Sequence, residues 1–151
     1  MKIKSLDQLS KLSVSIANRL GTEDCIFLFG EIGVGKTTFA RCFINYLQKK
    51  NKINISNVLS PTFNIVYDYD VKSHHIMHYD LYRLKSENEI NQLGIFENSK
   101  KTVKIIEWPE LITNKIDNKI ELHFTYNSKS DYRNINILGF GKWKKFAINE
   151  A

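Results

Sequence analysis

Residues 27–43 read FLFGEIGVGKTTFARCF, and this stretch determines how the rest of the fold is organised. An apolar run stops at Gly30, a glycine-spaced loop follows, and apolar residues recur at helical spacing from Lys36 or Thr37 onward. Gly30 to Thr37 match the phosphate-binding pattern G-x-x-x-x-G-K-[ST] at every fixed position. The strand before the loop and the helix after it are the context that this pattern requires.

The chemistry of such a loop follows from its residue types. Glycines let the backbone curl so that successive N–H groups point at phosphate oxygens, and the helix N-terminus adds a partial positive charge. Lys36 can reach the β- and γ-phosphates, the Thr37 hydroxyl can enter the Mg²⁺ shell, and Thr38 is a candidate for the α-phosphate. The loop residues that we expect to bind nucleotide are Glu31, Ile32, Gly33, Val34, Gly35, Lys36, Thr37 and Thr38.

A magnesium-dependent triphosphate site also needs an acidic residue at the end of a strand. Two candidates exist, because Asp80 ends the run HHIMHYD and Glu107 ends the run TVKIIE. Glu107 follows the cleaner buried run, so it is our first choice as the metal-side acid, together with Thr37. Asp80 could then position the attacking water or the water shell of the metal.

The loop Ser60-Pro61-Thr62 follows the predicted P-loop helix, in the part of the chain where many P-loop proteins place a γ-phosphate sensor. Thr62 could contact the metal or the attacking water through its hydroxyl. The alternative is that it caps the start of a strand.

The rest of the chain is predicted to alternate helices and strands, in the order that an α/β sandwich around a mixed sheet requires. Ser5 and Gln8 form a capping-box pattern that opens a first helix, and Gly21 is placed to end it. The expected strands and later helices are strand 25–29, a helix from 37 to about 50, a hairpin of 63–69 and 74–80, a short helix that starts after Ser86 and stops at Gly94, strand 102–108, and paired strands 119–126 and 133–140. We expect one three-layer P-loop domain over residues 1–151.

The bulk composition fits an ordinary globular protein, with 42% hydrophobic and 25% charged residues. No apolar run approaches the ~20 residues of a membrane span, and the first residues, MKIKSLDQLSKL, hold no signal-peptide segment, so we expect a cytoplasmic protein. Cys25 and Cys42 are interpreted as small buried thiols rather than a metal site or disulfide. The net charge of +6 comes mostly from scattered lysines, which favours a solvated surface over an RNA-binding face.

Three histidines, His74, His75 and His78, fall on one predicted strand, with His74 and His78 on the same face. No acid or cysteine completes a tetrahedral set with them, so we do not expect them to bind a metal.

The arginine content separates the possible functions. Small-molecule kinases bring arginines over the transferring phosphoryl group, because negative charge spreads over its oxygens in the transition state. This chain has four arginines, of which Arg83 and Arg133 are plausible contributors, and it has no lid-like insertion between them. The Asn-Lys-x-Asp motif of a GTPase is also missing, which favours ATP. The favoured function is therefore a slow ATPase. The alternatives are a small-molecule kinase, and a nucleotide-gated adaptor or RNA-binding module that does not turn the nucleotide over.

Several motifs in this order and spacing resemble the TsaE (YjeE) family, small bacterial P-loop ATPases needed to make threonylcarbamoyladenosine in tRNA. The motifs are GEIGVGKTTFAR, SPTFNIVYDY, HYDLYRL, ENEINQLGIFE and IIEWPE. The resemblance covers nearly the whole chain, from the first helix to the late strands.

The resemblance implies ATP and Mg²⁺ as ligands and assigns roles to individual residues. Lys36 and Thr37 would bind the phosphates and Mg²⁺, and Glu107 would complete the metal side. Asp80 would be important for hydrolysis and Thr62 would lie in a switch-like loop. The resemblance further implies that Trp108 would report nucleotide binding by its fluorescence, Arg133 would approach the nucleotide and Leu6 would flank the adenine.

The resemblance also implies partners. Proteins of this family act with the transferase TsaD and its paralogue TsaB, and ATP hydrolysis is thought to reset that complex between catalytic cycles. Contact with tRNA would then be indirect, and no membrane would be involved.

Overall fold

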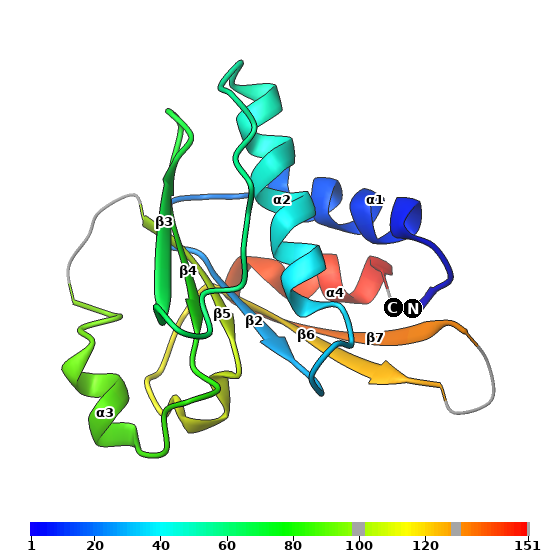
Figure 1. Cartoon of the computed structure of the whole chain (residues 1–151). Coiled ribbons are helices and arrows are strands. Elements are labelled where there is room, and N and C mark those ends of the chain that lie inside the picture. Colours follow the sequence, from blue (N-terminus) through cyan, green and yellow to red (C-terminus); the bar gives the residue numbers. More distant parts are fainter. Residues whose placement is uncertain (98–101, 128–130, 151) are drawn as a thin grey trace.

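The computed structural model describes residues 1–97, 102–127 and 131–150, and the strands within these ranges form one seven-stranded sheet (Figure 1). The strand order is β1-β7-β6-β2-β5-β4-β3. The strands are β1 (Lys2–Ile3), β2 (Cys25–Phe29), β3 (Val66–Asp70), β4 (His75–Asp80), β5 (Thr102–Glu107), β6 (Lys119–Tyr126) and β7 (Arg133–Phe140). The helices are α1 (Leu6–Ala17), α2 (Lys36–Lys50), α3 (Glu87–Gln92) and α4 (Lys144–Glu150), with 3₁₀ turns η1 (Pro109–Leu111) and η2 (Gly141–Trp143).

The sheet is mixed, as the sequence predicts. At its centre β2 runs parallel to both β5 and β6, and β4 runs parallel to β5. The outer pairs β3–β4, β6–β7 and β1–β7 are antiparallel. The carboxyl ends of β2, β4 and β5 therefore meet at one edge of the sheet, where open α/β sheets place their ligands.

Helices cover both faces of the sheet, so the fold is the predicted three-layer sandwich. Figure 1 shows α1, α2 and α4 together on one side and α3 on the other. The larger core lies under α1, α2 and α4, where Phe39 and Phe43 of α2 and Trp143 of η2 pack on alternate residues of the strands. A smaller core on the opposite face joins Phe27 of β2 to Ile90 of α3.

The central strands β2 and β5 are buried at consecutive rather than alternate positions. All six residues of β5 are buried, and so are the first four of β2, because neighbouring strands and both layers of helices surround them. The predicted strand 25–29 and the predicted strands 119–126 and 133–140 are confirmed to the residue.

Within the described residues, no helix has the length and apolar character needed to cross a membrane.

The predicted end of the first helix is wrong. Ser5 does cap α1, with its side chain accepting a hydrogen bond from the Gln8 N–H, but the helix ends at Ala17 rather than beside Gly21. The Gly21 N–H instead donates to Oδ2 of the buried Asp24 at 2.8 Å, so Gly21 belongs to the turn that leads into β2.

The hairpin is present, but β3 begins at Val66 instead of residue 63. Ile65 has φ +67°, a left-handed conformation that an extended strand cannot contain, and its N–H bonds to the Pro61 carbonyl. Residues 63–65 therefore belong to the loop between α2 and β3.

Sequence reasoning did not anticipate β1 or α4. Helix α4 packs on β7, and the approach is close at Gly139, where an added Cβ would overlap the Trp143 carbonyl. A glycine in the interior of a strand marks this kind of close approach by another backbone.

The first prediction concerns this contact. We expect Gly139→Ala to lower the free energy of unfolding by about 1–3 kcal/mol, because the methyl group must push η2 away from β7. Leu138→Ala is the matched control on the same strand, at an exposed position, and should change stability by less than about 0.5 kcal/mol. Urea unfolding followed by circular dichroism measures both, and equal stability of Gly139→Ala and the wild type would contradict the packing.

Candidate functional site

The loop between β2 and α2 has the backbone that its glycines predict. Gly30 has φ +135°, and a Cβ there would lie 2.6 Å from the Phe124 carbonyl oxygen. Gly35, the N-cap of α2, has φ +118°. Both conformations strain residues with a side chain, so glycine is required for the loop to turn from the strand into the helix.

Lys36 lies at the start of α2 and folds back over this loop. Its Nζ donates to the carbonyl oxygens of Gly30 at 2.6 Å and Glu31 at 2.9 Å, and it lies 4.1 Å from the centre of the Trp108 ring. The side chain is buried, with 4% of the residue exposed. Burial lowers the pKa of Lys36, and the negative charge of Glu107 opposes this shift.

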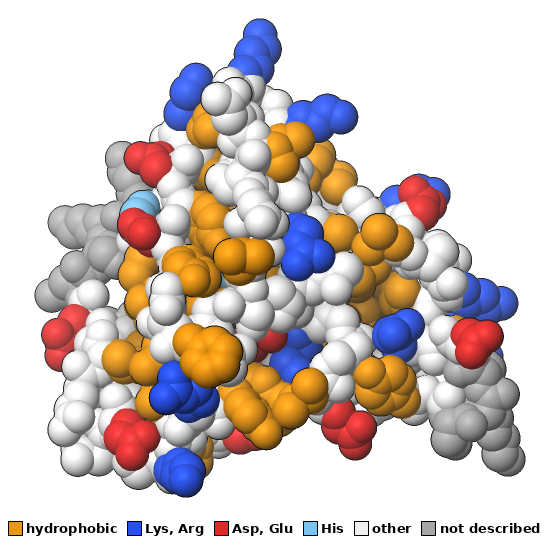
Figure 2. All heavy atoms as spheres, viewed as in Figure 1, with side chains coloured by type: hydrophobic (Ala, Val, Ile, Leu, Met, Phe, Trp, Pro, Cys, Tyr) orange, Lys and Arg blue, Asp and Glu red, His pale blue; other side chains and the backbone are white. Residues whose placement is uncertain are grey.

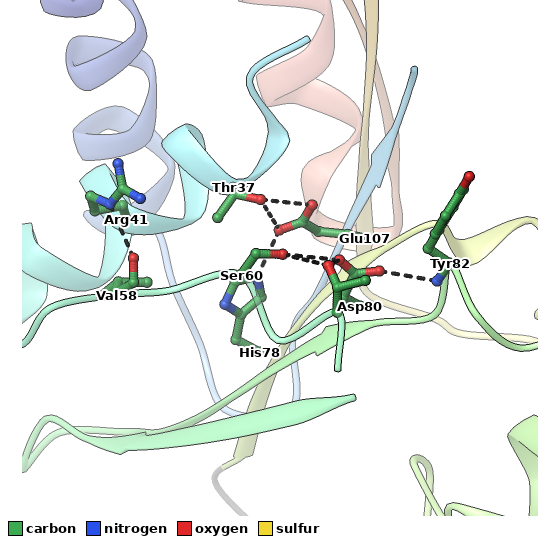
Figure 3. A network of polar contacts seen from close by, with 9 residues as sticks. Thr37, Arg41, Val58, Ser60, His78, Asp80, Tyr82 and Glu107 are labelled. Atoms are coloured by element: carbon green, nitrogen blue, oxygen red, sulfur yellow. Dashed lines mark hydrogen bonds and ion pairs between the residues drawn. The ribbon is translucent and has the colours of Figure 1, made fainter. Parts of the chain in front are cut away.

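Thr37 and Glu107 connect the first turn of α2 to the end of β5 (Figure 3). The Thr37 hydroxyl lies 2.9 Å from Oε1 and 3.1 Å from Oε2 of the Glu107 carboxylate. Glu107 is buried, so its charge is held at a fixed place beside the loop. The structure thus brings together the two residues that the sequence predicts as metal ligands.

Asp80 lies beside Glu107, because the two are direct partners at the ends of the parallel strands β4 and β5. Its Oδ2 accepts hydrogen bonds from the hydroxyls of Thr62 at 2.6 Å and Ser60 at 3.1 Å, as Figure 3 shows for Ser60. Its Oδ1 accepts from the Tyr82 N–H at 3.0 Å. Asp80 therefore holds the loop that carries Thr62 against the end of the sheet.

These groups line one cavity of about 260 Å³. Its walls come from the glycine loop and the first residues of α2, from the loop before β3, and from the ends of β4 and β5. The lining residues are Ile32, Gly33, Gly35, Lys36, Thr37, Thr38, Ser60, Thr62, Asp80, Tyr82, Glu107 and Trp108. All four residues predicted to be catalytic, Lys36, Thr62, Asp80 and Glu107, are thus in the same place.

A second cavity shares Gly33, Gly35 and Thr38 with the first and extends toward the amino end of α1. Leu6 and Arg133 both line it, so the residue that the resemblance places beside the adenine and the one that it places near the nucleotide lie together, next to the phosphate loop. The Nε of Arg133 is buried and has no hydrogen-bond partner among the described residues, which leaves a donor for a ligand.

Two of the predicted loop residues lie apart from the cavities. The Val34 side chain is buried in the core under α2, and Glu31 is exposed. Neither lines either cavity, so contact of these two residues with a nucleotide stays a prediction.

Trp108 follows Glu107 directly and has φ +58° in the left-handed region. This conformation turns the chain out of β5 and places the indole over Lys36, with Tyr82 packing on it at 4.8 Å between ring centres. Strain of this kind is costly for a bulky residue and is concentrated at functional sites. Sequence reasoning identified Trp108 as a neighbour of the acid but gave no hint of its contact with Lys36.

Sequence reasoning did not connect His78 to the site, although the structure places it there. It is fully buried in β4, and its Nε2 lies 2.9 Å from Glu107 Oε1 (Figure 3). Strand periodicity places His78 on the same face as Asp80, which could have linked it to the acidic end of the strand. The contact itself crosses to β5 and cannot be found from the local pattern.

The chemistry of these groups fits Mg²⁺. A hydroxyl and a carboxylate are hard oxygen donors, and Mg²⁺ bound with a nucleotide uses one or two such protein groups plus phosphate oxygens and water. In residues 1–97, 102–127 and 131–150 no cluster of three or more His, Cys, Asp or Glu side chains could hold a metal on its own.

A strand–loop–helix cradle with a lysine, a threonine and two acids at adjacent strand ends defines a P-loop NTPase-like protein. A family model described as "Threonylcarbamoyl adenosine biosynthesis protein TsaE" matches residues 3–135. The chain belongs to the TsaE family, which confirms the resemblance found in its motifs.

Relatives and a solved structure agree with this assignment. A protein of Rickettsia conorii named tRNA threonylcarbamoyladenosine biosynthesis protein TsaE is 39% identical over 110 residues, which cover 73% of this chain and 61% of the relative. A TsaE protein of Haemophilus influenzae is 32% identical over 109 residues, covering 70% of this chain and 66% of that protein. The crystal structure of Bacillus subtilis YdiB superposes with a TM-score of 0.72 at 20% identity, covering 99% of this chain and 90% of that one, which supports the fold.

The second prediction tests how Asp80 holds the loop. Thr62→Val keeps the shape of the side chain but removes the hydroxyl that donates to Asp80. We expect amide hydrogen exchange of residues 59–64 to become about fivefold faster, which corresponds to a hydrogen bond of about 1 kcal/mol. Thr22→Val is the control at an exposed position in the turn before β2. Unchanged exchange in Thr62→Val would show that the hydrogen bond does not hold the loop.

Proposed function

We propose that this protein binds ATP with Mg²⁺ in the cavity between the glycine loop and the ends of β4 and β5, and hydrolyses it slowly. We further propose that residues 1–151 act as one domain in the cytoplasm, and that hydrolysis serves the formation of threonylcarbamoyladenosine in tRNA together with TsaD and TsaB. The observation that carries the proposal is the 2.9 Å contact between Thr37 and Glu107, inside a phosphate cradle.

Each polar group of the cavity has a part in this proposal. Lys36 would exchange its two backbone carbonyl partners for phosphate oxygens, which offer it a full negative charge instead of a dipole. Thr37 and Glu107 would hold Mg²⁺, which neutralises charge on the phosphates when it is bound. Asp80, with Thr62 beside it, would orient the attacking water. Leu6 and Arg133 would contact the base and sugar in the adjoining cavity.

The arginines support slow hydrolysis in the absence of partners. All four arginines lie in the described residues, and none lines the cavity with Lys36 and Glu107. Three of them donate to backbone carbonyls: Arg19 to Ser15, Arg41 to Val58 and Arg83 to Phe63. Without an arginine on the transferring phosphoryl group, charge in the transition state is poorly compensated, and supply of such a charge in trans can be worth 10³–10⁵ in rate.

The surface around the cavity supports the action of partners. Figure 2 shows hydrophobic side chains gathered near the centre of the face that carries α2 and residues 53–65. Exposed hydrophobic residues of this region include Ile32, Leu59, Phe63 and Tyr82, and Phe63 has 83% of its surface exposed. Apolar groups left in water around a polar cavity are typical of a surface that contacts another protein.

The third prediction is a turnover assay. We expect slow ATP hydrolysis by the protein alone and faster hydrolysis when TsaD and TsaB are added. Lys36→Ala and Glu107→Ala should lower the rate by about 100-fold or more, because each removes a charge that acts directly on the phosphates or the metal. Lys49→Ala, at the exposed end of α2, is the matched control and should keep the wild-type rate.

The same assay separates the alternatives. Equal rates with and without TsaD and TsaB would contradict the action of partners. A phosphorylated metabolite in place of free phosphate would identify a small-molecule kinase, and tight ATP binding without any turnover under either condition would identify an adaptor.

A further inference from the structure

His78 faces Glu107 from the neighbouring strand. In the sheet register His78 is the direct partner of Ile105, and Glu107 lies two residues further along β5 on the same face. The imidazole reaches forward along the strand, and its Nε2 lies 2.9 Å from Glu107 Oε1. Both side chains are almost completely buried, with exposures of 0% and 3%.

A polar ring at this position needs a reason, because the preceding residue on the same face, Ile76, and the residue across from it, Ile105, are both apolar. Ile76 and Ile105 are fully buried beside it, and an apolar residue at position 78 would continue the core without a desolvation cost. The contact with Glu107 provides the reason. An ionised carboxylate can only accept hydrogen bonds, so the proton between the two groups is carried by Nε2. His78 Nδ1 is buried with no partner among the described residues, so Glu107 is its one contact of this kind there.

The hydrogen bonds of Glu107 show how His78 contributes to the orientation of its carboxylate. The Thr37 hydroxyl has a single proton and lies within reach of both carboxylate oxygens, at 2.9 and 3.1 Å. Thr37 alone therefore does not select one oxygen over the other. His78 contacts Oε1, and so it distinguishes the two oxygens and fixes the rotation of the carboxylate about its last bond.

We propose that His78 is a positioning residue for Glu107: its Nε2–H holds Oε1, so that Oε2 stays turned toward the cavity as a metal-side oxygen. The inference rests on the proposed function, because that oxygen matters when Mg²⁺ arrives with the nucleotide. Residues that orient a metal-binding group from behind contribute typically 10–100-fold to metal affinity or activity. His78 would thus contribute to the coupling between Mg²⁺ and nucleotide without touching either one.

The fourth prediction uses two amide substitutions that differ in reach. In His78→Gln the amide nitrogen of the new glutamine extends about as far from the backbone as Nε2 of the histidine, so it can still donate to Oε1. In His78→Asn the amide nitrogen of the new asparagine extends only about as far as Nδ1, so it cannot reach Oε1. Calorimetry gives the affinity for a non-hydrolysable ATP analogue once with Mg²⁺ and once with EDTA. The ratio of these two affinities measures how strongly the metal contributes to binding.

We expect His78→Gln to keep the wild-type ratio within about threefold and His78→Asn to lower it by about tenfold or more. The affinity in EDTA should be the same for both variants and the wild type, because the glycine loop and Lys36 are unchanged. Thermal unfolding of both variants accompanies the measurement. If His78→Asn does not fold, the measurement on His78→Gln tests the proposal by itself. A folded His78→Gln variant with a tenfold lower ratio of the two affinities would overturn the proposal.

Two other results would also overturn it. A wild-type ratio in His78→Asn would show that Glu107 needs no support from His78, and an equal loss in both variants would show that the shape of the ring matters rather than its hydrogen bond. In each case the wild type still binds the nucleotide with Mg²⁺, and the proposed function stands. Absence of binding in the wild type itself would overturn both proposals.

Discussion

The hydrogen bond between Thr37 and Glu107 is the contact on which the site depends. It joins the first turn of α2 to the end of β5, two segments that are 70 residues apart in the chain. The bond forms because β2 and β5 are parallel neighbours, so that the glycine loop after β2 and the acid that ends β5 meet at one edge. A glycine loop without this acid would bind phosphate, and an acid without the loop would be an ordinary strand end.

Other side chains around this bond hold the parts of the site in place. Asp80, at the end of the next strand, holds the loop with Ser60 and Thr62. His78 holds Glu107 from inside the sheet. The Trp108 ring packs against the Lys36 ammonium group. The cavity has the lysine and the acids that a nucleotide with Mg²⁺ needs, but none of the four arginines of the chain lines it. This imbalance fits a protein whose proposed hydrolysis depends on partners.

Much of this could be predicted from the sequence, because the decisive signals are local. The run CIFLF reads directly as a buried central strand, the glycine motif fixes the loop, and Asp80 and Glu107 stand at strand ends that parallel pairing brings together. The misplaced boundaries have local causes that hydrophobic periodicity does not show. The left-handed backbone of Ile65 delays β3, and the hydrogen bond of Gly21 to Asp24 lies after α1 has already ended.

The features that sequence reasoning missed depend on contacts between distant segments. The position of α4 requires the close approach to Gly139, and the role of His78 requires the register between β4 and β5. Periodicity gives the face of a strand on which a residue lies, but not which residue of the next strand it meets. A single sequence therefore shows His78 as a histidine in a strand, and the structure shows what it contacts.

A crystal structure with Mg²⁺ and a non-hydrolysable ATP analogue tests the central claim most directly. The account predicts Mg²⁺ bound to the Thr37 hydroxyl and to Glu107, directly or through one water, with the γ-phosphate at Lys36 and the contact between His78 and Glu107 Oε1 intact. A nucleotide bound outside the glycine loop, or a metal held without Thr37 and Glu107, would contradict it.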